Sequence, residues 1–309
     1  MEASATAPTT VAGVRKGTRY LAEVEALRGG AIALVFAFHV TAILDGPQEH
    51  RPGIWVSPLR AFMDAGHSGV SLFFVLSAFL LALPFWDEIL FGHTVDRRRY
   101  AIRRALRILP LYWTIVVATS AVLAHNPRDL LHGAPYLLFL QAIPALSGAL
   151  LPSSSVWWSL STEVQFYALL PFLPWVCRSR IRLLVTGGAL LAAYFAGVVS
   201  HPSSLGIGGY LALNHSVLGR APLFLIGIAA AYLFHTRAHQ IRAWLVRQPA
   251  LRIGGSDALL LALLLAQGLL LRRVRFAGYW HAEQAVPEWH AVEGLCWALV
   301  LLVLVLFPL

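Results

Sequence analysis

The sequence has few of the residues that mark a soluble or a secreted domain. Only 13% of its 309 residues are charged, and only two, Cys177 and Cys296, are cysteines. Two cysteines so far apart in the chain predict neither a disulfide framework nor a metal site. The sequence also lacks the His-Glu-x-x-His, P-loop and dinucleotide-binding patterns, so it does not indicate a zinc protease, a P-loop nucleotide hydrolase or a dehydrogenase.

Apolar residues are what the chain has in abundance: 58% of it is hydrophobic, and its mean hydropathy is +0.67. A helix that crosses a bilayer needs about 20 mostly apolar residues. The clearest candidate spans are 27–45, 67–86, 107–125, 157–177, 183–200, 218–235, 256–271 and 292–309. A further apolar stretch, 130–151, is interrupted by prolines and is either another span or a re-entrant segment. We therefore predict an all-α fold, a polytopic transmembrane helical bundle of about 8–10 spans.

The net charge of +9 comes from basic residues that cluster beside the predicted spans. Such clusters usually lie on the cytoplasmic side of a membrane, and they favour a topology signal over a nucleic-acid site. Arg15, Lys16 and Arg19 precede the first span, and the arginine-rich segment 97–107 lies between the second and third spans. We therefore expect a cytoplasmic N-terminus and a cytoplasmic 97–107 segment. The basic run at 272–275 falls on the outer side, against this rule.

The first residues, 1–18, are rich in Ala, Thr and Ser and predict a disordered cytoplasmic tail. They lack the apolar centre of a cleavable signal peptide, so we expect the first span to direct its own insertion. The remaining residues, 19–309, are predicted to form one multi-pass domain in the cytoplasmic membrane.

Two ionisable residues, Arg28 and His39, lie in the first span with ten residues between them. Eleven helical steps of about 100° bring both to one helix face, roughly 16 Å apart along the axis. An arginine near the membrane surface and a histidine deep in the bilayer are costly, and such groups are usually functional. The alternative is an interfacial arginine anchor together with a histidine that is hydrogen-bonded to a neighbouring helix.

Three arginines lie within one turn of one another just before Pro110. Arg103 and Arg107 are four residues apart, and Arg104 and Arg107 are three apart. Guanidinium groups bind phosphate through paired hydrogen bonds, and coenzyme A carries both a pyrophosphate and a ribose phosphate. We call Arg103, Arg104 and Arg107 the arginine fork. The alternative is a topology determinant whose side chains reach the lipid headgroups.

Polar residues recur at intervals of four at the start of the predicted span 157–177. Ser159, Glu163 and Tyr167 are expected to line one helix face. A buried carboxylate must be paired, hydrogen-bonded or protonated, and His39 or an arginine is the expected partner of Glu163. Glu163 could otherwise be a structural tie between helices. Ser77, a lone hydroxyl in the second span, is expected to bond its own helix.

Four segments occur in an order that is specific in combination. They are LRGGA at 27–31 running to His39, GVSLFFVLS at 69–77, RRALRILPLY at 103–112 and WSLSTEVQFY at 158–167. In that order they resemble the membrane acyltransferase-3 family of multi-span O-acyltransferases. A weaker similarity is RAPLFLIG at 220–227, and the resemblance covers about residues 20–235.

The resemblance implies a bacterial membrane enzyme that transfers an acyl group from cytoplasmic acyl-CoA to a hydroxyl, usually on a sugar or a glycosylated acceptor. Acetyl-CoA is the expected donor. The resemblance also implies that Arg28 and His39 are the catalytic pair and that Arg104 and Arg107 bind acyl-CoA. No metal ion is implied.

The sequence departs from the family pattern in three places. Ser71 stands where the family often has Asp, and Ala78 stands where it usually has Gly. The Tyr-Leu-x-His ending of a late helix is absent, and the chain stops within an apolar run. We therefore expect a C-terminally short member of the family.

Acyl transfer to an alcohol needs a base, an anchor for the donor and a group that stabilises the oxyanion. Our hypothesis is that His39 takes the hydroxyl proton, because histidine titrates near the working pH, and that Glu163 orients or charges it. Arg28 would hold a phosphate or the developing oxyanion, and the arginine fork would hold the coenzyme. The residues predicted to support this site are Ser77, Ser159 and Tyr167.

Two rival functions use the same residues differently. A transporter or flippase would use the buried His, Glu and Arg side chains as a proton or substrate pathway. A non-catalytic membrane scaffold would tolerate every polar substitution named above. An acyltransferase differs from both because it consumes acyl-CoA and releases a free thiol.

Overall fold

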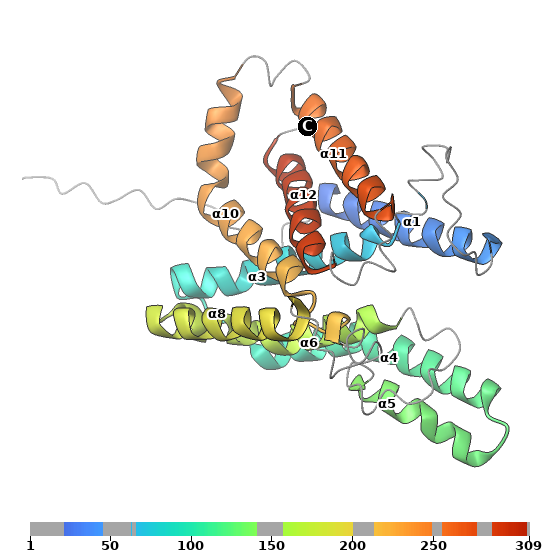
Figure 1. Ribbon diagram of the computed structural model, residues 1–309. Coiled ribbons are helices and arrows are strands. Elements are labelled where there is room, and N and C mark those ends of the chain that lie inside the picture. The colour runs from blue at the N-terminus through green and yellow to red at the C-terminus, as the bar shows by residue number, and fades with distance from the viewer. Residues whose placement is uncertain are drawn as a thin grey trace, which may run out of the picture.

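The computed structural model describes residues 22–45, 63, 66–140, 157–199, 213–248, 255–276 and 286–307. All regular secondary structure in these residues is helical (Figure 1), so the predicted all-α fold is confirmed. The predicted tail and residues 141–151 lie outside the described residues. The helices are α1 (Ala22–Asp45), α3 (Ser68–Phe91), α4 (Arg97–Leu123), η1 (Pro127–Gly133), α5 (Ala134–Leu137), α6 (Trp158–Leu169), η5 (Leu170–Phe172), α7 (Leu173–Cys177), α8 (Arg180–Tyr194), η6 (Phe195–Val199), α10 (Ala221–Val246), α11 (Ser256–Phe276) and α12 (Val286–Leu306).

Six helices in the described residues are long and apolar enough to cross a membrane, namely α1, α3, α4, α8 continued into η6, α10 and α12. The apolar part of α11, Ser256–Leu271, is shorter. The span predicted at 157–177 is divided into α6, η5 and α7, because Pro171 and Pro174 have no N–H to donate and crowd the preceding turn. The described residues therefore hold fewer long apolar helices than the number of spans predicted from the sequence.

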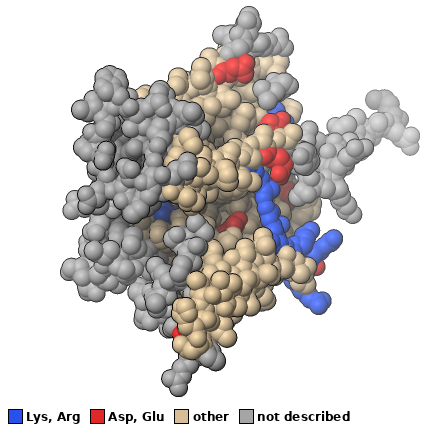
Figure 2. Space-filling model, turned by 90° about the vertical axis from the view of Figure 1, so that its right-hand side faces the viewer, with Lys and Arg blue, Asp and Glu red and all other residues tan. Residues whose placement is uncertain are grey.

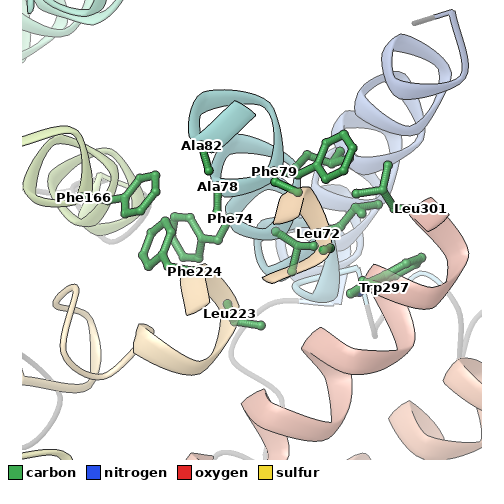
Figure 3. Close-up of a cluster of buried hydrophobic side chains, with 14 of the residues drawn as sticks. Leu72, Phe74, Ala78, Phe79, Ala82, Phe166, Leu223, Phe224, Trp297 and Leu301 are labelled. Atoms are coloured by element: carbon green, nitrogen blue, oxygen red, sulfur yellow. The ribbon is translucent and has the colours of Figure 1, made fainter. Parts of the chain in front are cut away.

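Helix α3 lies in the middle of the bundle and packs against α1, α10 and α12 (Figure 1). On one side of it, Phe74 packs on Phe224 of α10, and Phe224 in turn packs on Phe166 of α6 (Figure 3). The rings of Phe166 and Phe224 are stacked with centroids 4.2 Å apart. On the other side, Figure 3 shows Trp297 and Leu301 of α12. Dispersion contacts of this kind hold helices together in lipid, where the hydrophobic effect between helices is weak.

Glycines let α1 approach the first turns of α3 closely. A Cβ atom placed on Gly66 would lie 2.0 Å from the carbonyl oxygen of Leu34, and one on Gly69 would lie 2.5 Å from that of Ala31. Any larger residue at these positions would push the two backbones apart. The contact holds α1 against α3 through the part of α1 that lies between Arg28 and His39.

The outer surface of the described residues is largely apolar, as expected for a protein surrounded by lipid tails. No residue of α8 is buried, although the helix is apolar enough to span a membrane. Figure 2 shows one face of the molecule, where Lys and Arg gather together at one side and most of the remaining described surface is neither acidic nor basic. This separation of apolar and basic surface fits the predicted membrane placement.

Gly227 provides a test of the packing between α10 and α3. A Cβ atom at Gly227 would lie 2.6 Å from the Ala78 Cβ and 2.6 Å from the Val75 carbonyl oxygen. We expect Gly227→Ala to lower stability by about 1–3 kcal/mol, because the helices must separate to admit the methyl group.

The matched control is Gly187→Ala in α8, where a Cβ atom would meet nothing within 4 Å. We expect that change to be neutral or slightly stabilising, since alanine favours helix more than glycine does. Thermal unfolding of the purified protein in detergent compares the two variants. Equal melting temperatures would contradict the close packing at Gly227.

Candidate functional site

His39 lies in the second half of α1 and is half-buried. Its ring Nδ1 is 2.7 Å from the carbonyl oxygen of Val35, one turn earlier. Because a carbonyl oxygen only accepts hydrogen bonds, Nδ1 carries the proton in this contact, and the neutral ring then has its lone pair on Nε2. The ring of Phe38 packs edge-on against the imidazole with centroids 5.3 Å apart. His39 is thus held in a tautomer whose Nε2 can accept a proton.

Arg28 lies on the same continuous helix, in its second turn. Its Nη1 donates to Oε1 of Glu25 at 3.0 Å, and its side chain is 24% exposed. This contact uses one of the five N–H donors of the guanidinium, so the group can still bind an anion. The uninterrupted helix gives the axial separation of roughly 16 Å from His39 that the sequence predicts.

The chain turns sharply between α3 and α4, at the start of the arginine-rich segment. Gly92 ends α3 with a φ of 73°, a left-handed conformation that favours glycine, and its N–H donates to the carbonyl of Glu88. Asp96 caps α4 by accepting from the N–H of Arg99 at 2.9 Å. These two caps fix the direction in which α4, with its arginines, continues from the end of α3.

Arg97 is bound within the protein. Its guanidinium donates to both carboxylate oxygens of Glu88, with Nη2 2.7 Å from Oε1. It also donates to the Val95 carbonyl at 2.7 Å, and Arg178 Nη2 lies 3.8 Å from the Glu88 carboxylate. Arg97 therefore ties the end of α3 to the start of α4.

The arginine fork is divided between the inside and the outside of the bundle. Arg103 and Arg107 are exposed, whereas Arg104 is half-buried. The guanidinium carbon of Arg104 lies 5.8 Å from the centre of the Tyr167 ring, a cation–π distance. Its Nε–H is buried and donates to no acceptor in the described residues.

Glu163 of α6 forms a polar cluster with residues of α3 and α4. Its Oε1 accepts hydrogen bonds from Ser77 Oγ at 2.7 Å and from Tyr167 OH at 2.5 Å. Tyr100 of α4 donates to the Tyr167 carbonyl at 3.3 Å. Ser159 is half-buried one turn earlier on α6. The structure thus brings together Glu163, Tyr167, Ser77 and Arg104 of the predicted site.

Two predicted contacts are not formed as expected. Ser77 crosses to Glu163 instead of bonding its own helix, because the carboxylate is a stronger acceptor than a backbone carbonyl that is already bonded. Glu163 and His39 have separate partners among the described residues, so the carboxylate does not orient this imidazole. The roles predicted for Arg28, His39 and the arginine fork stay predictions.

A second buried polar cluster, which the sequence did not predict, lies where α3, α10 and α12 begin. Arg220, His290 and Glu293 are only 4%, 1% and 0% exposed. Arg220 Nη1 contacts both ring nitrogens of His290, at 3.0 Å from Nδ1, and His290 Nδ1 lies 3.5 Å from Glu293 Oε2. Ser71 Oγ donates to the same oxygen at 2.8 Å. We call these four residues the His290 cluster.

The chemistry of the donors sets the charge of this cluster. A guanidinium only donates hydrogen bonds, so at least one of the two ring nitrogens that it contacts is unprotonated and His290 is neutral. When Glu293 is ionised, its negative charge balances the positive charge of Arg220. The signal in the sequence was the three-residue spacing of His290 and Glu293, which puts both on one helix face. The predicted span begins at residue 292 and leaves His290 outside it.

Aromatic and histidine rings connect the His290 cluster with its surroundings. His67 is close enough to His290 for their charges to interact, and its ring packs against Phe38, 5.7 Å away between centroids. Phe38 in turn contacts His39. The His290 cluster therefore lies at the same end of α3 as the predicted base.

His215, which precedes α10 in the chain, lies beside the same cluster. It stacks on Trp158 with centroids 4.3 Å apart, and the Arg220 guanidinium carbon lies 4.8 Å from the Trp158 ring. Burial, together with the charge of Arg220, lowers the pKa of the His215 imidazole to about 3. His215 is thus neutral at physiological pH and packs as an aromatic ring.

Within the part of the chain that the structure describes, no three His, Cys, Asp or Glu side chains gather closely enough to hold a metal ion. The described residues instead provide arginine side chains as hydrogen-bond donors, the imidazole of His39 as an acceptor, and the carboxylates of Glu163 and Glu293. Such groups suit proton transfer and the binding of a polar ligand.

Comparison with known proteins places the chain among membrane acyltransferases. A family model described as "Acyltransferase domain" matches residues 21–308. BcsY of Komagataeibacter xylinus, which carries the name of a membrane-bound transacylase, is 25% identical over 91% of this chain and 64% of its own length. The peptidoglycan O-acetyltransferase OatA of Listeria monocytogenes is 26% identical over 62% of this chain and 31% of its own.

The exopolysaccharide production protein ExoZ of Rhizobium meliloti is 33% identical over 43% of this chain and 42% of its own length. The chain thus spans less than two thirds of each of these relatives. No solved structure matches it.

Proposed function

The chain belongs to the membrane acyltransferase-3 family, and we propose that it is an integral membrane O-acyltransferase that moves a short acyl group from acyl-CoA to a hydroxyl of a sugar or glycosylated acceptor. The relatives' names refer to a transacylase, to O-acetylation of peptidoglycan and to exopolysaccharide production. The observation that carries the proposal is His39, an imidazole held in an apolar bundle with its Nε2 available as a proton acceptor.

In the proposed reaction the acceptor hydroxyl oxygen attacks the carbonyl carbon of the thioester while its proton passes to His39 Nε2. The tetrahedral intermediate that forms carries its negative charge on the former carbonyl oxygen. When it collapses, the carbon–sulfur bond breaks, and the leaving thiolate takes the proton from the imidazolium. The products are an ester and free coenzyme A, and His39 returns to its neutral form. The bond from Nδ1 to the Val35 carbonyl keeps the ring oriented throughout.

The donor is expected to enter from the basic side. Arg103 and Arg107 are exposed there and can bind phosphate groups of coenzyme A. Arg104, from the same turns of α4, points inward toward Tyr167, so it can hold the donor deeper in the bundle. By the positive-inside rule we expect this side to face the cytoplasm, where acyl-CoA is made.

Glu163 serves the donor side in this scheme. Its hydrogen bond fixes the hydroxyl of Tyr167, and the ring of Tyr167 lies against the Arg104 guanidinium. Ser77 occupies the same carboxylate oxygen from α3. The carboxylate thus positions Tyr167 and, through it, Arg104. Arg28, at the surface end of α1, remains free to hold a phosphate or to approach the oxyanion.

Replacement of His39 tests the base directly. We expect His39→Ala to lower the rate of acyl transfer by a factor of about 10²–10⁴, the usual contribution of a general base, without lowering the amount of protein in the membrane. The measurement is release of free thiol from acetyl-CoA by membranes that carry equal amounts of each variant. Thr41→Val, two residues further along α1, is the matched control because Thr41 only bonds carbonyls of its own helix. Undiminished turnover in His39→Ala would refute the assignment.

The coenzyme site is tested by the double variant Arg104→Ala with Arg107→Ala. We expect the KM for acetyl-CoA to rise roughly tenfold or more, because hydrogen bonds to charged groups contribute about 1.5–3 kcal/mol each. Arg98→Ala with Arg99→Ala is the matched control, since both side chains are exposed in the same basic segment. If both double variants keep the wild-type KM, these arginines determine topology and do not bind the donor.

A further inference from the structure

The proposed reaction does not use the His290 cluster, although burying its charged groups in an apolar bundle costs free energy. Its charged and polar groups are almost completely buried in a bundle of apolar helices. Ionisable groups inside a membrane protein are rare and usually mark a substrate or proton site. A well-packed apolar cluster could replace a purely structural ion pair at little cost in stability. The cluster therefore calls for a function.

The carboxylate of Glu293 has one oxygen without a partner. Oε2 accepts the hydrogen bond from Ser71 and faces His290, whereas Oε1 is buried and receives no hydrogen bond from the described residues. The Ser68 hydroxyl also lies near this carboxylate, but it makes no hydrogen bond to Oε1. If Glu293 is ionised, Oε1 lacks a donor; if Glu293 is protonated there, the hydrogen lacks an acceptor. A partner is missing in either state. A hydroxyl group could serve in both, because it can donate and accept.

We propose that Glu293 Oε1 binds a hydroxyl group of the acceptor, so that the His290 cluster is the acceptor-binding site; this inference rests on the proposed function. Ser71 already supplies a hydroxyl to the other oxygen of the same carboxylate, which shows that the geometry suits an alcohol. His290 Nδ1 lies 3.5 Å from the oxygen that Ser71 binds, and Arg220 contacts the His290 ring.

The charge of the cluster indicates the chemical class of the ligand. When Glu293 is ionised it balances the positive charge of Arg220, and because His290 is neutral the cluster then offers no excess positive charge to a phosphate or a carboxylate. An anionic group next to Glu293 would be repelled. The site therefore suits a neutral, hydroxyl-rich molecule such as an uncharged sugar unit.

The location of the cluster agrees with this role. Ser71 lies in the first turn of α3, whereas Glu88, which binds Arg97 at the basic side, lies at the other end of the same helix. Phe38 packs against both His67 and His39, and it lies beside Gly66 just before α3 begins. An acceptor held at Glu293 would thus lie at the same end of α3 as His39, and a donor held at Arg104 would reach them from the other end.

The test separates acceptor binding from donor binding in the full chain. Glu293→Ala and Glu293→Gln are each expressed in cells from which the gene has been deleted, and the acyl groups on their extracted carbohydrate are measured by mass spectrometry. The Kd of each purified variant for acetyl-CoA is measured in detergent. Asp87→Asn, which alters a partly exposed carboxylate at the far end of α3, is the matched control.

We expect Glu293→Ala to lower carbohydrate acylation about tenfold or more while the Kd for acetyl-CoA changes less than about twofold. Retained acetyl-CoA binding also reports that the variant is folded. Should the alanine variant fail to accumulate, Glu293→Gln gives the same comparison, because it keeps the side-chain volume and replaces one acceptor oxygen with a donor.

Two results would overturn the acceptor site: unchanged acylation, which would leave a buried water as the partner of Oε1, or a loss of acetyl-CoA affinity in step with acylation. A wild-type chain that neither binds acetyl-CoA nor acylates carbohydrate would instead overturn the proposed function and, with it, this site.

Discussion

Polar side chains on α3 must find partners on other helices, because neither lipid tails nor apolar side chains can supply a hydrogen bond. This requirement determines which helices meet α3 and at what level. A serine near its start bonds α12, a serine near its middle bonds α6, and a glutamate near its end bonds α4. The pairs are Ser71 with Glu293, Ser77 with Glu163, and Glu88 with Arg97.

These pairs place different chemistry at different depths. The end of α3 is tied to α4, whose arginines can receive a phosphorylated donor. The middle of α3 bonds Glu163 of α6, which holds Tyr167 next to Arg104. The first turns of α3 carry the His290 cluster and lie against α1, where Gly66 and Gly69 allow the backbones to touch. His39 on α1 therefore lies at the acceptor side, at the end of α3 that is opposite the basic donor side, and it has no ion pair of its own among the described residues.

The sequence predicts the helical membrane fold well, because the length of an apolar run is a local property. It also predicts that Arg28 and His39 share one helix. It fails where the answer depends on tertiary contacts. The partner of Ser77 lies on α6, and nothing local to either segment indicates it. Pro171 and Pro174 are visible in the sequence, yet apolar content alone made their segment resemble a single span.

The most direct measurement follows the acyl group itself. Membranes from cells with and without the gene are supplied with acetyl-CoA that is isotopically labelled in the acetyl group, and the carbohydrate fraction is analysed by mass spectrometry. The account predicts labelled acetyl esters on carbohydrate, with equal release of free coenzyme A, only where the protein is present. Equal label in both samples, or movement of a solute across the membrane without any consumption of acetyl-CoA, would contradict it.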